Sequence, residues 1–385
     1  MRLFLIAGEP SGDALGAALM TGLDEASPTP PAFSGVGGPL MQAQGLTSQF
    51  PMHELSVMGL AEVLPKYLHL KRRIQETADA VLADPPDALI TIDSPDFTLR
   101  VARIVKAARP DIPTIHYVAP TVWAWRAGRA AKMAQVIDHV LALFPFEPPY
   151  MTEAGMTCDF VGHPVVAKPR ATPTQAASFR QAHDIAANAP LVLALPGSRR
   201  GEVARLADVF GASLAALQQD HPELRVVLPV APAVADEVAR VIHRWRTPPI
   251  LVNPERDGIS AKDAAFAAAD LALAASGTVS LELAAAGTPM VIAYDMNWFS
   301  RQIISHLLKV DTVTLVNLIS ETRAVPEFLG EACKPADIAR ALGDILADPG
   351  RQNRAMSLTM ERLGLGGPSP GLMAARSVLS HLKAG

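Results

Sequence analysis

Short apolar runs alternate with stretches of helical periodicity along the whole chain, and this alternation constrains the fold more than any other feature. An apolar run of about five residues, bounded by glycine, proline or polar turns, is typical of a strand buried in a parallel sheet. Such runs occur at residues 3–7, 32–36, 88–93, 114–118, 140–144, 160–161, 191–195, 225–230, 250–252, 271–275, 290–294 and 314–315. The pattern predicts an α/β protein built from βαβ units.

The length of 385 residues and a proline-rich stretch near the middle indicate two domains. We expect a doubly wound domain over residues 1–168, a second over 169–363, and a final helix within 364–385 that returns to the first domain. Ligands of doubly wound sheets bind beyond the carboxyl ends of the strands. We therefore expect two Rossmann-like domains with parallel sheets, facing each other across a cleft that holds the site.

Composition excludes several classes of protein. The net charge of −4 gives no reason to expect a nucleic-acid partner. The two cysteines, Cys158 and Cys333, share no motif, which argues against a disulfide framework and for a reducing cytoplasm. No cysteine or histidine spacing suits a metal, and no stretch approaches the roughly 18 apolar residues of a membrane span. We expect no metal, no cofactor and a soluble or peripheral protein.

Two turns in the second half place small residues between a strand and a helix. Free N–H groups and the helix dipole at such a position favour phosphate, and an arginine adds a cation for a diphosphate. Glu282 lies one turn further along, where its carboxylate can accept from ribose hydroxyls. An ordinary N-capped helix would show the same residues at either turn. The presence of two such turns in one domain nevertheless predicts a nucleoside diphosphate held without a metal. The anion-binding candidates are Ser198, Arg199, Ser276, Gly277 and Thr278.

The first half carries acidic side chains at two strand ends. Glu9, Ser11 and Asp13 lie in a glycine-rich turn that is neither the GxGxxG of dehydrogenases nor a P-loop. They offer acceptors for sugar hydroxyls, or Ser11 or Asp13 simply caps the first helix. Asp93 is the last residue of the predicted strand at 88–93, and a carboxylate at a strand end can act as a general base. Asp96 is a weaker candidate, because it can cap the next helix.

Two tryptophans and an arginine follow the strand at 114–118. Trp123, Trp125 and Arg126 lie within four residues of one another, in a chain with four tryptophans in all. Aromatic faces stack on sugars and a guanidinium pairs with phosphate, so Trp123 and Arg126 are substrate candidates. A packed loop core would explain the tryptophans equally well.

A predicted helix over residues 59–73 has an apolar stripe beside a run of basic side chains. This pattern fits contact with an acyl chain or a membrane surface, although an ordinary core-facing helix shares it. The candidates for this contact are Met58, Leu60, Val63, Leu64, Tyr67 and Leu68. We expect a kink or a fresh start at Pro65, because proline breaks a helix interior.

Taken together, these motifs resemble those of the lipid-A-disaccharide synthase family. The resemblance is carried in order by residues 7–13, 56–64, 92–97, 117–126, 196–199 and 275–278. It implies an inverting glycosyltransferase with two Rossmann-like domains, the GT-B arrangement. The implied reaction transfers 2,3-diacylglucosamine from its UDP derivative to the 6-hydroxyl of 2,3-diacylglucosamine 1-phosphate. The products are the β-1,6-linked lipid A disaccharide 1-phosphate and UDP.

For that reaction we expect Asp93 to be the base, with Asp96 and Glu9 as the other candidates. The resemblance adds Asn317, which matches a polar position implicated in the family, and a need for no metal. It also strengthens the acyl-chain role of the helix at 59–73 and implies a cytoplasmic protein attached peripherally to the inner membrane. A homodimer stays open.

Two other classes of function remain. Another transferase or an epimerase on this fold would use UDP-N-acetylglucosamine and would not need the acyl contact. A catalytically inactive protein would bind a UDP-sugar without turnover, and the presence of Asp93 argues against it.

Overall fold

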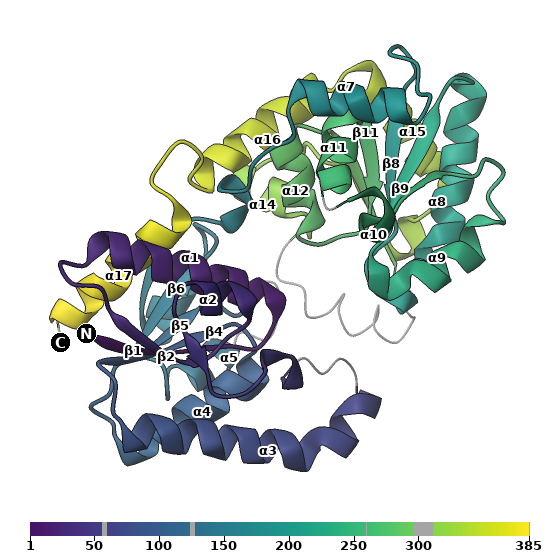
Figure 1. The fold of residues 1–385 in the computed structure, drawn as a ribbon. Coiled ribbons are helices and arrows are strands. Elements are labelled where there is room, and N and C mark those ends of the chain that lie inside the picture. The colour runs from purple at the N-terminus through teal and green to yellow at the C-terminus, as the bar shows by residue number, and fades with distance from the viewer. Residues whose placement is uncertain (56–59, 124–127, 259, 296–310, 385) are drawn as a thin grey trace. The chain divides into compact units, whose positions relative to one another are not determined.

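Parallel strands, each followed by a helix, form two separate sheets in the computed structural model (Figure 1). The structure describes residues 1–55, 60–123, 128–258, 260–295 and 311–384. The chain divides into unit 1, which contains Met1–Ala167 and Leu363–Gly385, and unit 2, which contains Lys168–Arg362. The two parallel sheets with their helices confirm the α/β fold class that the sequence predicted.

Unit 1 holds a seven-stranded sheet in the order β3-β2-β1-β4-β5-β6-β7. Its strands are β1 Arg2–Ala7, β2 Ala32–Val36, β3 Thr47–Ser48, β4 Ala88–Ile92, β5 Thr114–Tyr117, β6 His139–Ala142 and β7 Thr157–Phe160. Its helices are α1 Pro10–Ala26, α2 Pro39–Ala43, α3 Leu60–Ala83, α4 Pro95–Ala108, α5 Gly128–Met133, α6 Pro148–Glu153 and α17 Pro370–Ala384. The strand order reverses between β1 and β4, which is where doubly wound sheets bind ligands.

Unit 2 holds a six-stranded parallel sheet in the order β10-β9-β8-β11-β12-β13. Its strands are β8 Leu191–Leu195, β9 Arg225–Pro229, β10 Ile250–Val252, β11 Leu271–Ala274, β12 Met290–Tyr294 and β13 Glu327–Leu329. Its helices are α7 Pro173–Ala182, α8 Arg200–Asp220, α9 Ala235–Ile242, α10 Pro254–Asp257, α11 Ser260–Ala268, α12 Val279–Ala286, α14 Leu315–Ser320, α15 Pro335–Ala347 and α16 Gly350–Arg362. Here the order reverses between β8 and β11.

The central strands explain why the sequence shows continuous apolar runs instead of alternation. Every residue of β4, β8 and β11 is buried, because helices cover both faces of each sheet (Figure 1). None of the helices in the described part of the chain is long and apolar enough to cross a membrane.

The last helix, α17, packs against the first helix of unit 1. A Cβ added to Gly22 of α1 would lie 2.4 Å from the carbonyl oxygen of Gly371, so the two backbones approach closely there. Ser377 of α17 also donates to Asp159 at 2.6 Å and bonds to His139 Nε2 at 2.7 Å. These contacts join the end of the chain to α1, β6 and β7.

One expected strand is a helix in the structure. Residues 314–315 begin α14, and the sixth strand is β13, which the sequence pattern did not indicate. The short run Leu315-Val316-Asn317-Leu318-Ile319 is apolar apart from its asparagine, and periodicity alone cannot distinguish a buried helix from a strand over such a length. The Glu327 carboxylate accepts from the N–H groups of Val313 and Thr314 and so holds the start of this helix beside β13. The seventh strand of unit 1 likewise lies at Thr157–Phe160, earlier than the expected 160–161.

Candidate active site

A pocket of about 630 Å³ lies at the carboxyl ends of the central strands of unit 2. Because β8 and β11 are neighbours, the pocket brings together the two turns that the sequence predicted as anion sites. Its polar lining consists of Gly197, Ser198, Arg199, Glu202, Lys262, Ser276, Gly277, Thr278 and Glu282. Its apolar lining includes Val230, Ala231, Pro232, Val252, Phe266 and Val279. A pocket lined by both polar and apolar side chains suits a nucleotide, which has charged phosphates and a largely apolar base.

The turn before α8 is closed by a side chain of its own helix. Oε2 of Glu202 accepts hydrogen bonds from the backbone N–H groups of Ser198 and Arg199 at 3.2 and 3.3 Å. Oε1 pairs with the Arg199 guanidinium at 3.1 Å. Gly197 has a φ of +120°, and a Cβ there would lie 2.6 Å from the Glu202 Cβ, so only glycine leaves room for this carboxylate. The N–H groups that were expected to hold a diphosphate are thus occupied by Glu202, an internal anion.

The turn before α12 is open. Within the described ranges, the backbone N–H groups of Ser276, Gly277, Thr278 and Val279 have no acceptor, and the Thr278 side chain makes no cap. Ser280 Oγ donates to the Gly277 carbonyl at 2.9 Å, which helps to fix the turn. Unpaired N–H groups at a helix N-terminus attract anions. Of the two expected phosphate turns, this one is available without rearrangement.

Glu282, the expected ribose ligand, lies in the first turn of α12 and is about one-third exposed. Its Oε2 accepts from Lys262 Nζ of α11 at 2.5 Å, and Lys168 Nζ lies 3.7 Å from its Oε1. Lys262 also lies over the Phe266 ring, 5.0 Å from the ring centroid. No sequence pattern pointed to Lys262, which is 20 residues from Glu282 and reaches it only through the packing of α11 beside α12.

In unit 1, Asp93 follows β4 directly in a strained turn. Asp93 and Ser94 both have positive φ, +51° and +46°, and so does Val118 after the neighbouring β5, at +86°. The Asp93 N–H donates to the Tyr117 carbonyl, and its own carbonyl accepts from Thr98 Oγ1 at 2.9 Å. Non-glycine residues held at positive φ are uncommon and collect at functional sites. The half-buried Asp93 therefore lies at a backbone position that the surrounding bonds enforce.

The other acidic candidates of unit 1 have different environments. Glu9 is exposed at the N-cap of α1, and Ser11 is exposed in its first turn. Asp96 is exposed in the first turn of α4, but Ser94 is the N-cap residue there. Asp13 is buried and accepts from the N–H groups of Gly38, Leu40 and Met41. Asp13 thus caps α2 instead of offering an acceptor to a sugar or capping its own helix.

Trp123 belongs to a packed aromatic cluster instead of an open stacking surface. It is 9% exposed and lies edge-on to Phe146, with the ring centroids 5.2 Å apart. Phe144 stacks on Phe146 at 5.5 Å and on His163 at 5.4 Å. The packed-core alternative therefore holds for Trp123, because its ring is covered within unit 1. Arg126 lies outside the described residues.

Beneath this cluster lies a buried carboxyl that no sequence pattern indicated. Glu147 is 3% exposed, and its Oε2 accepts from the N–H groups of Leu143 and Phe144 at 3.1 and 3.0 Å. Burial raises the pKa of Glu147 to about 8, although these two N–H groups oppose the rise. The Trp123 indole N–H faces the same carboxyl and lowers its pKa further, but the contact falls outside hydrogen-bond geometry.

Asn317 is buried, and its side-chain amide is hydrogen-bonded within the protein. Its Nδ2 donates to the Val325 carbonyl at 2.9 Å and to Thr312 Oγ1 at 3.3 Å, and its Oδ1 accepts from the Val325 N–H at 3.0 Å. These bonds use both N–H groups of the amide and one acceptor site of its oxygen, so Asn317 has a scaffolding role in this structure. It ties α14 to the segment before β13.

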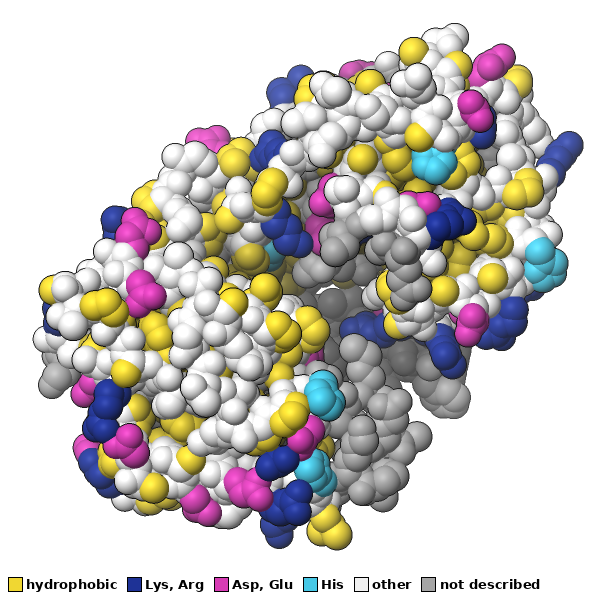
Figure 2. Space-filling view, viewed as in Figure 1, with side chains coloured by type: hydrophobic (Ala, Val, Ile, Leu, Met, Phe, Trp, Pro, Cys, Tyr) yellow, Lys and Arg dark blue, Asp and Glu magenta, His cyan; other side chains and the backbone are white. Residues whose placement is uncertain are grey.

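The candidates for acyl contact are only partly described. Leu60, Val63, Leu64 and Tyr67 belong to α3, but their side chains and all of Met58 lie outside the described residues. Leu68 is 77% exposed, and Lys71 and Arg72 beyond it are also exposed. Arg73 instead turns to Glu54 and covers Phe50 at 4.4 Å. Acidic, basic and histidine side chains intermingle over α3 in Figure 2.

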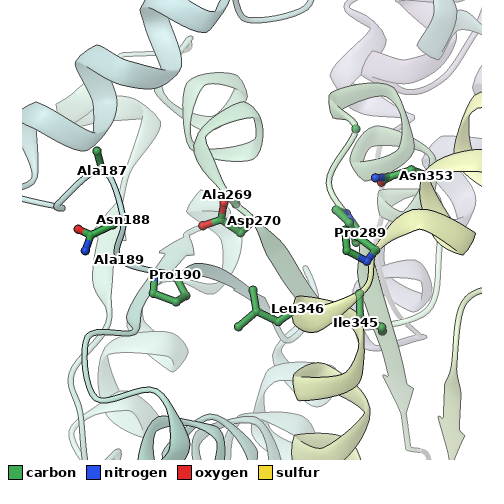
Figure 3. Close-up of a pocket in the computed structure, with 12 residues that line it drawn as sticks. Ala187, Asn188, Ala189, Pro190, Ala269, Asp270, Pro289, Ile345, Leu346 and Asn353 are labelled. Atoms are coloured by element: carbon green, nitrogen blue, oxygen red, sulfur yellow. The ribbon is translucent and has the colours of Figure 1, made fainter.

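A second pocket, of about 440 Å³, lies at the opposite end of the sheet in unit 2 (Figure 3). Pro190, Asp270 and Pro289 line it, and they precede β8, β11 and β12. The Asp270 carboxylate accepts from the Leu191 N–H at 2.8 Å and pairs with Arg180 at 2.7 Å. Arg180 therefore already balances the charge of the Asp270 carboxylate. Doubly wound sheets also bind their ligands at the other end of the strands, so this pocket is not the candidate site.

The family model and the curated relatives place the chain in one family, and solved structures share its fold. The model of the lipid-A-disaccharide synthetase family matches residues 3–369. The chain is 64% identical to the lipid-A-disaccharide synthase of Ruegeria pomeroyi, over 99% of this chain and 96% of that protein. Its fold is similar to the UDP-GlcNAc 2-epimerase of Neisseria meningitidis bound to UDP-GlcNAc, with a TM-score of 0.65, 12% identity and full coverage of both chains. It is also similar to MurG of Acinetobacter baumannii, with a TM-score of 0.55, 14% identity and coverage of 100% and 99%.

Proposed function

The chain belongs to the lipid-A-disaccharide synthase family and is a glycosyltransferase of lipid A biosynthesis, and from this premise we propose its substrates and the residues that handle them. The donor is UDP-2,3-diacylglucosamine, and the acceptor is the 6-hydroxyl of 2,3-diacylglucosamine 1-phosphate. The products are the β-1,6-linked disaccharide 1-phosphate and UDP. The open turn before α12, in one pocket with Arg199 and Glu282, is the observation that carries this proposal.

In the proposed donor site, the N–H groups of Ser276 to Val279 receive the diphosphate. Arg199 is 77% exposed, so its guanidinium is free to turn from Glu202 to a phosphate. Glu282 accepts from the ribose hydroxyls, and the apolar wall around Phe266 covers the base. Preformed donors at the leaving group stabilise the charge that develops there when the glycosidic bond breaks.

Unit 1 supplies the acceptor side in this proposal. Inversion requires the acceptor hydroxyl to attack the anomeric carbon from the face opposite UDP, with a base to take its proton. The strained turn after β4 supports Asp93 as that base, because its backbone bonds hold the carboxylate at a strand end. Glu9 and Ser11, exposed at the start of α1 just after the adjacent β1, are our candidates for binding sugar hydroxyls at the same edge of the sheet.

We also propose that the protein works at the cytoplasmic face of the inner membrane, because both substrates carry acyl chains. The exposed Leu68 beside Lys71 and Arg72 supports contact of α3 with an anionic lipid surface. Apolar and basic side chains together are typical of peripheral membrane binding.

The test is to incubate the full chain with both acylated substrates and EDTA and to detect the disaccharide 1-phosphate. Product formation supports the proposal, and turnover of a deacylated UDP-sugar at the same rate contradicts it. Asp93→Asn should lower kcat by about 10²–10⁴-fold and leave UDP affinity unchanged. Asp96→Asn tests the other candidate carboxylate of this turn and should keep near-native turnover, whereas near-native turnover by Asp93→Asn would rule out Asp93 as the base.

A further inference from the structure

Lys262 lines the nucleotide pocket and makes its shortest contact with the side chain proposed to bind ribose. The distance from its Nζ to Glu282 Oε2 is 2.5 Å, whereas Lys168 Nζ is 3.7 Å from Oε1. Lys262 is 39% exposed and Lys168 is 67% exposed. Lys262 is therefore the partner that sets where the carboxylate of Glu282 points.

Lys262 is itself held in place from two sides. It lies in the first turn of α11, and its ammonium lies over the ring of Phe266, four residues later on the same helix. Phe266 is 2% exposed, so the ring is a fixed surface. A cation between an aromatic face and a carboxylate has few alternative positions.

Lys262 also affects the balance of charge in the pocket. Two of the four charged side chains that line the pocket are acidic: Glu202 pairs with Arg199, and Glu282 pairs closely with Lys262 and more distantly with Lys168 outside the lining. A diphosphate brings more negative charge into this space. An unpaired Glu282 would repel it, since a carboxylate and a phosphate a few ångströms apart interact strongly away from bulk water. Paired with Lys262, Glu282 can approach the ribose without this penalty.

We propose that Lys262 is a positioning residue that aims Glu282 at the ribose hydroxyls and offsets its charge beside the diphosphate. Selectivity for a ribonucleotide over its 2′-deoxy analogue therefore depends on Lys262. This inference rests on the proposed UDP site and extends it to the side chain behind the ligand contact. An ion pair that only decorated the surface would leave that selectivity unchanged.

The experiment compares UDP and 2′-deoxy-UDP by isothermal titration calorimetry on the full chain. The native protein should prefer UDP by about tenfold or more, the value of one hydrogen bond to a charged acceptor. Lys262→Met should reduce the preference below about threefold, and Lys262→Arg should retain it. The control is Arg340→Met, which breaks an ion pair with Asp337 on α15, away from the pocket, and should change nothing.

A double-mutant cycle completes the test. Glu282→Gln should lose the same selectivity as Lys262→Met, and the double variant should lose no more, because both changes remove one contact. Native-like selectivity in a folded Lys262→Met variant, or additive losses in the cycle, would overturn the role of Lys262. Equal binding of both nucleotides by the native protein would overturn the ribose role of Glu282 and leave the UDP site standing. Absence of UDP binding would overturn the donor site as well.

Discussion

Glu147 should make the stability of the protein fall between pH 6.5 and 8. Its carboxyl is 3% exposed beneath the aromatic cluster, and burial raises its pKa from 4.5 to about 8. The folded chain therefore keeps this proton over a range in which the unfolded chain has released it. Stability from the neutral carboxyl is complete below pH 4.5 and is lost as the pH rises through 8.

The magnitude follows from this difference in pKa. Each pH unit within the window costs about 1.4 kcal/mol, so the full loss by pH 8 is about 5 kcal/mol. At lower pH, His116 and His139 oppose the loss of stability caused by Glu147. Burial lowers the pKa of each histidine to about 4, so their contribution to stability rises with pH up to about 6.5. Above pH 6.5 the histidines contribute no further change. The loss due to Glu147 between pH 6.5 and 8 is then about 2 kcal/mol.

Urea denaturation of the full chain at pH 6.5 and 8.5 measures this loss. Glu147→Gln keeps an oxygen for the N–H groups of Leu143 and Phe144 but cannot ionise. The native protein should lose about 2 kcal/mol relative to this variant between the two pH values. Glu153→Gln, an exposed change at the end of the same helix, is the control and should track the native protein. Parallel pH profiles for the native protein and Glu147→Gln would refute the reasoning.

Three further changes separate scaffold from site. Asn317→Ala should cost roughly 2–4 kcal/mol, because it leaves buried backbone groups unpaired, and thermal melting measures the loss. A normal melting temperature with weakened UDP binding would contradict its scaffolding role. Glu202→Gln should tighten UDP binding up to about fivefold in calorimetry, since it frees Arg199 from an exposed ion pair worth no more than about 1 kcal/mol; weaker binding would show that Glu202 supports the ligand. Gly22→Ala should loosen α17 at Gly371 and cost about 1–3 kcal/mol, seen as faster tryptic release of the C-terminal helix, and unchanged cleavage would argue against the close approach.

Much of the fold could be predicted because strands buried on both faces leave an unambiguous apolar run, as at Leu191–Leu195 and Leu271–Ala274. The prediction was wrong where a run was short and carried a polar residue. Asn317 interrupts such a run, and its bonds to Val325 are made only once β13 is in place. A contact between a helix residue and a loop residue eight positions later leaves no periodic signal.

The site was predictable only to the level of its turns. Small residues after a strand indicated both phosphate turns. Whether a turn is closed, as before α8, or open, as before α12, depends on one side chain. Glu202 lies three residues after Arg199, the spacing of a capping box, so a signal for the closed turn was present in the sequence. Lys262 left none, because α11 and α12 place it beside Glu282 through tertiary packing alone.

The two cations of the pocket differ in how easily they can leave their carboxylate partners. Arg199 is 77% exposed and pairs with a carboxylate on its own helix, so releasing it to a phosphate costs about 1 kcal/mol or less. Lys262 is held between Glu282 and Phe266, and moving it would leave Glu282 only its longer, more exposed pair with Lys168 beside the ligand. The turn at Ser276 to Val279 needs no rearrangement at all. UDP affinity should therefore depend mainly on the α12 turn, whereas Arg199 acts chiefly as the leaving diphosphate gains charge.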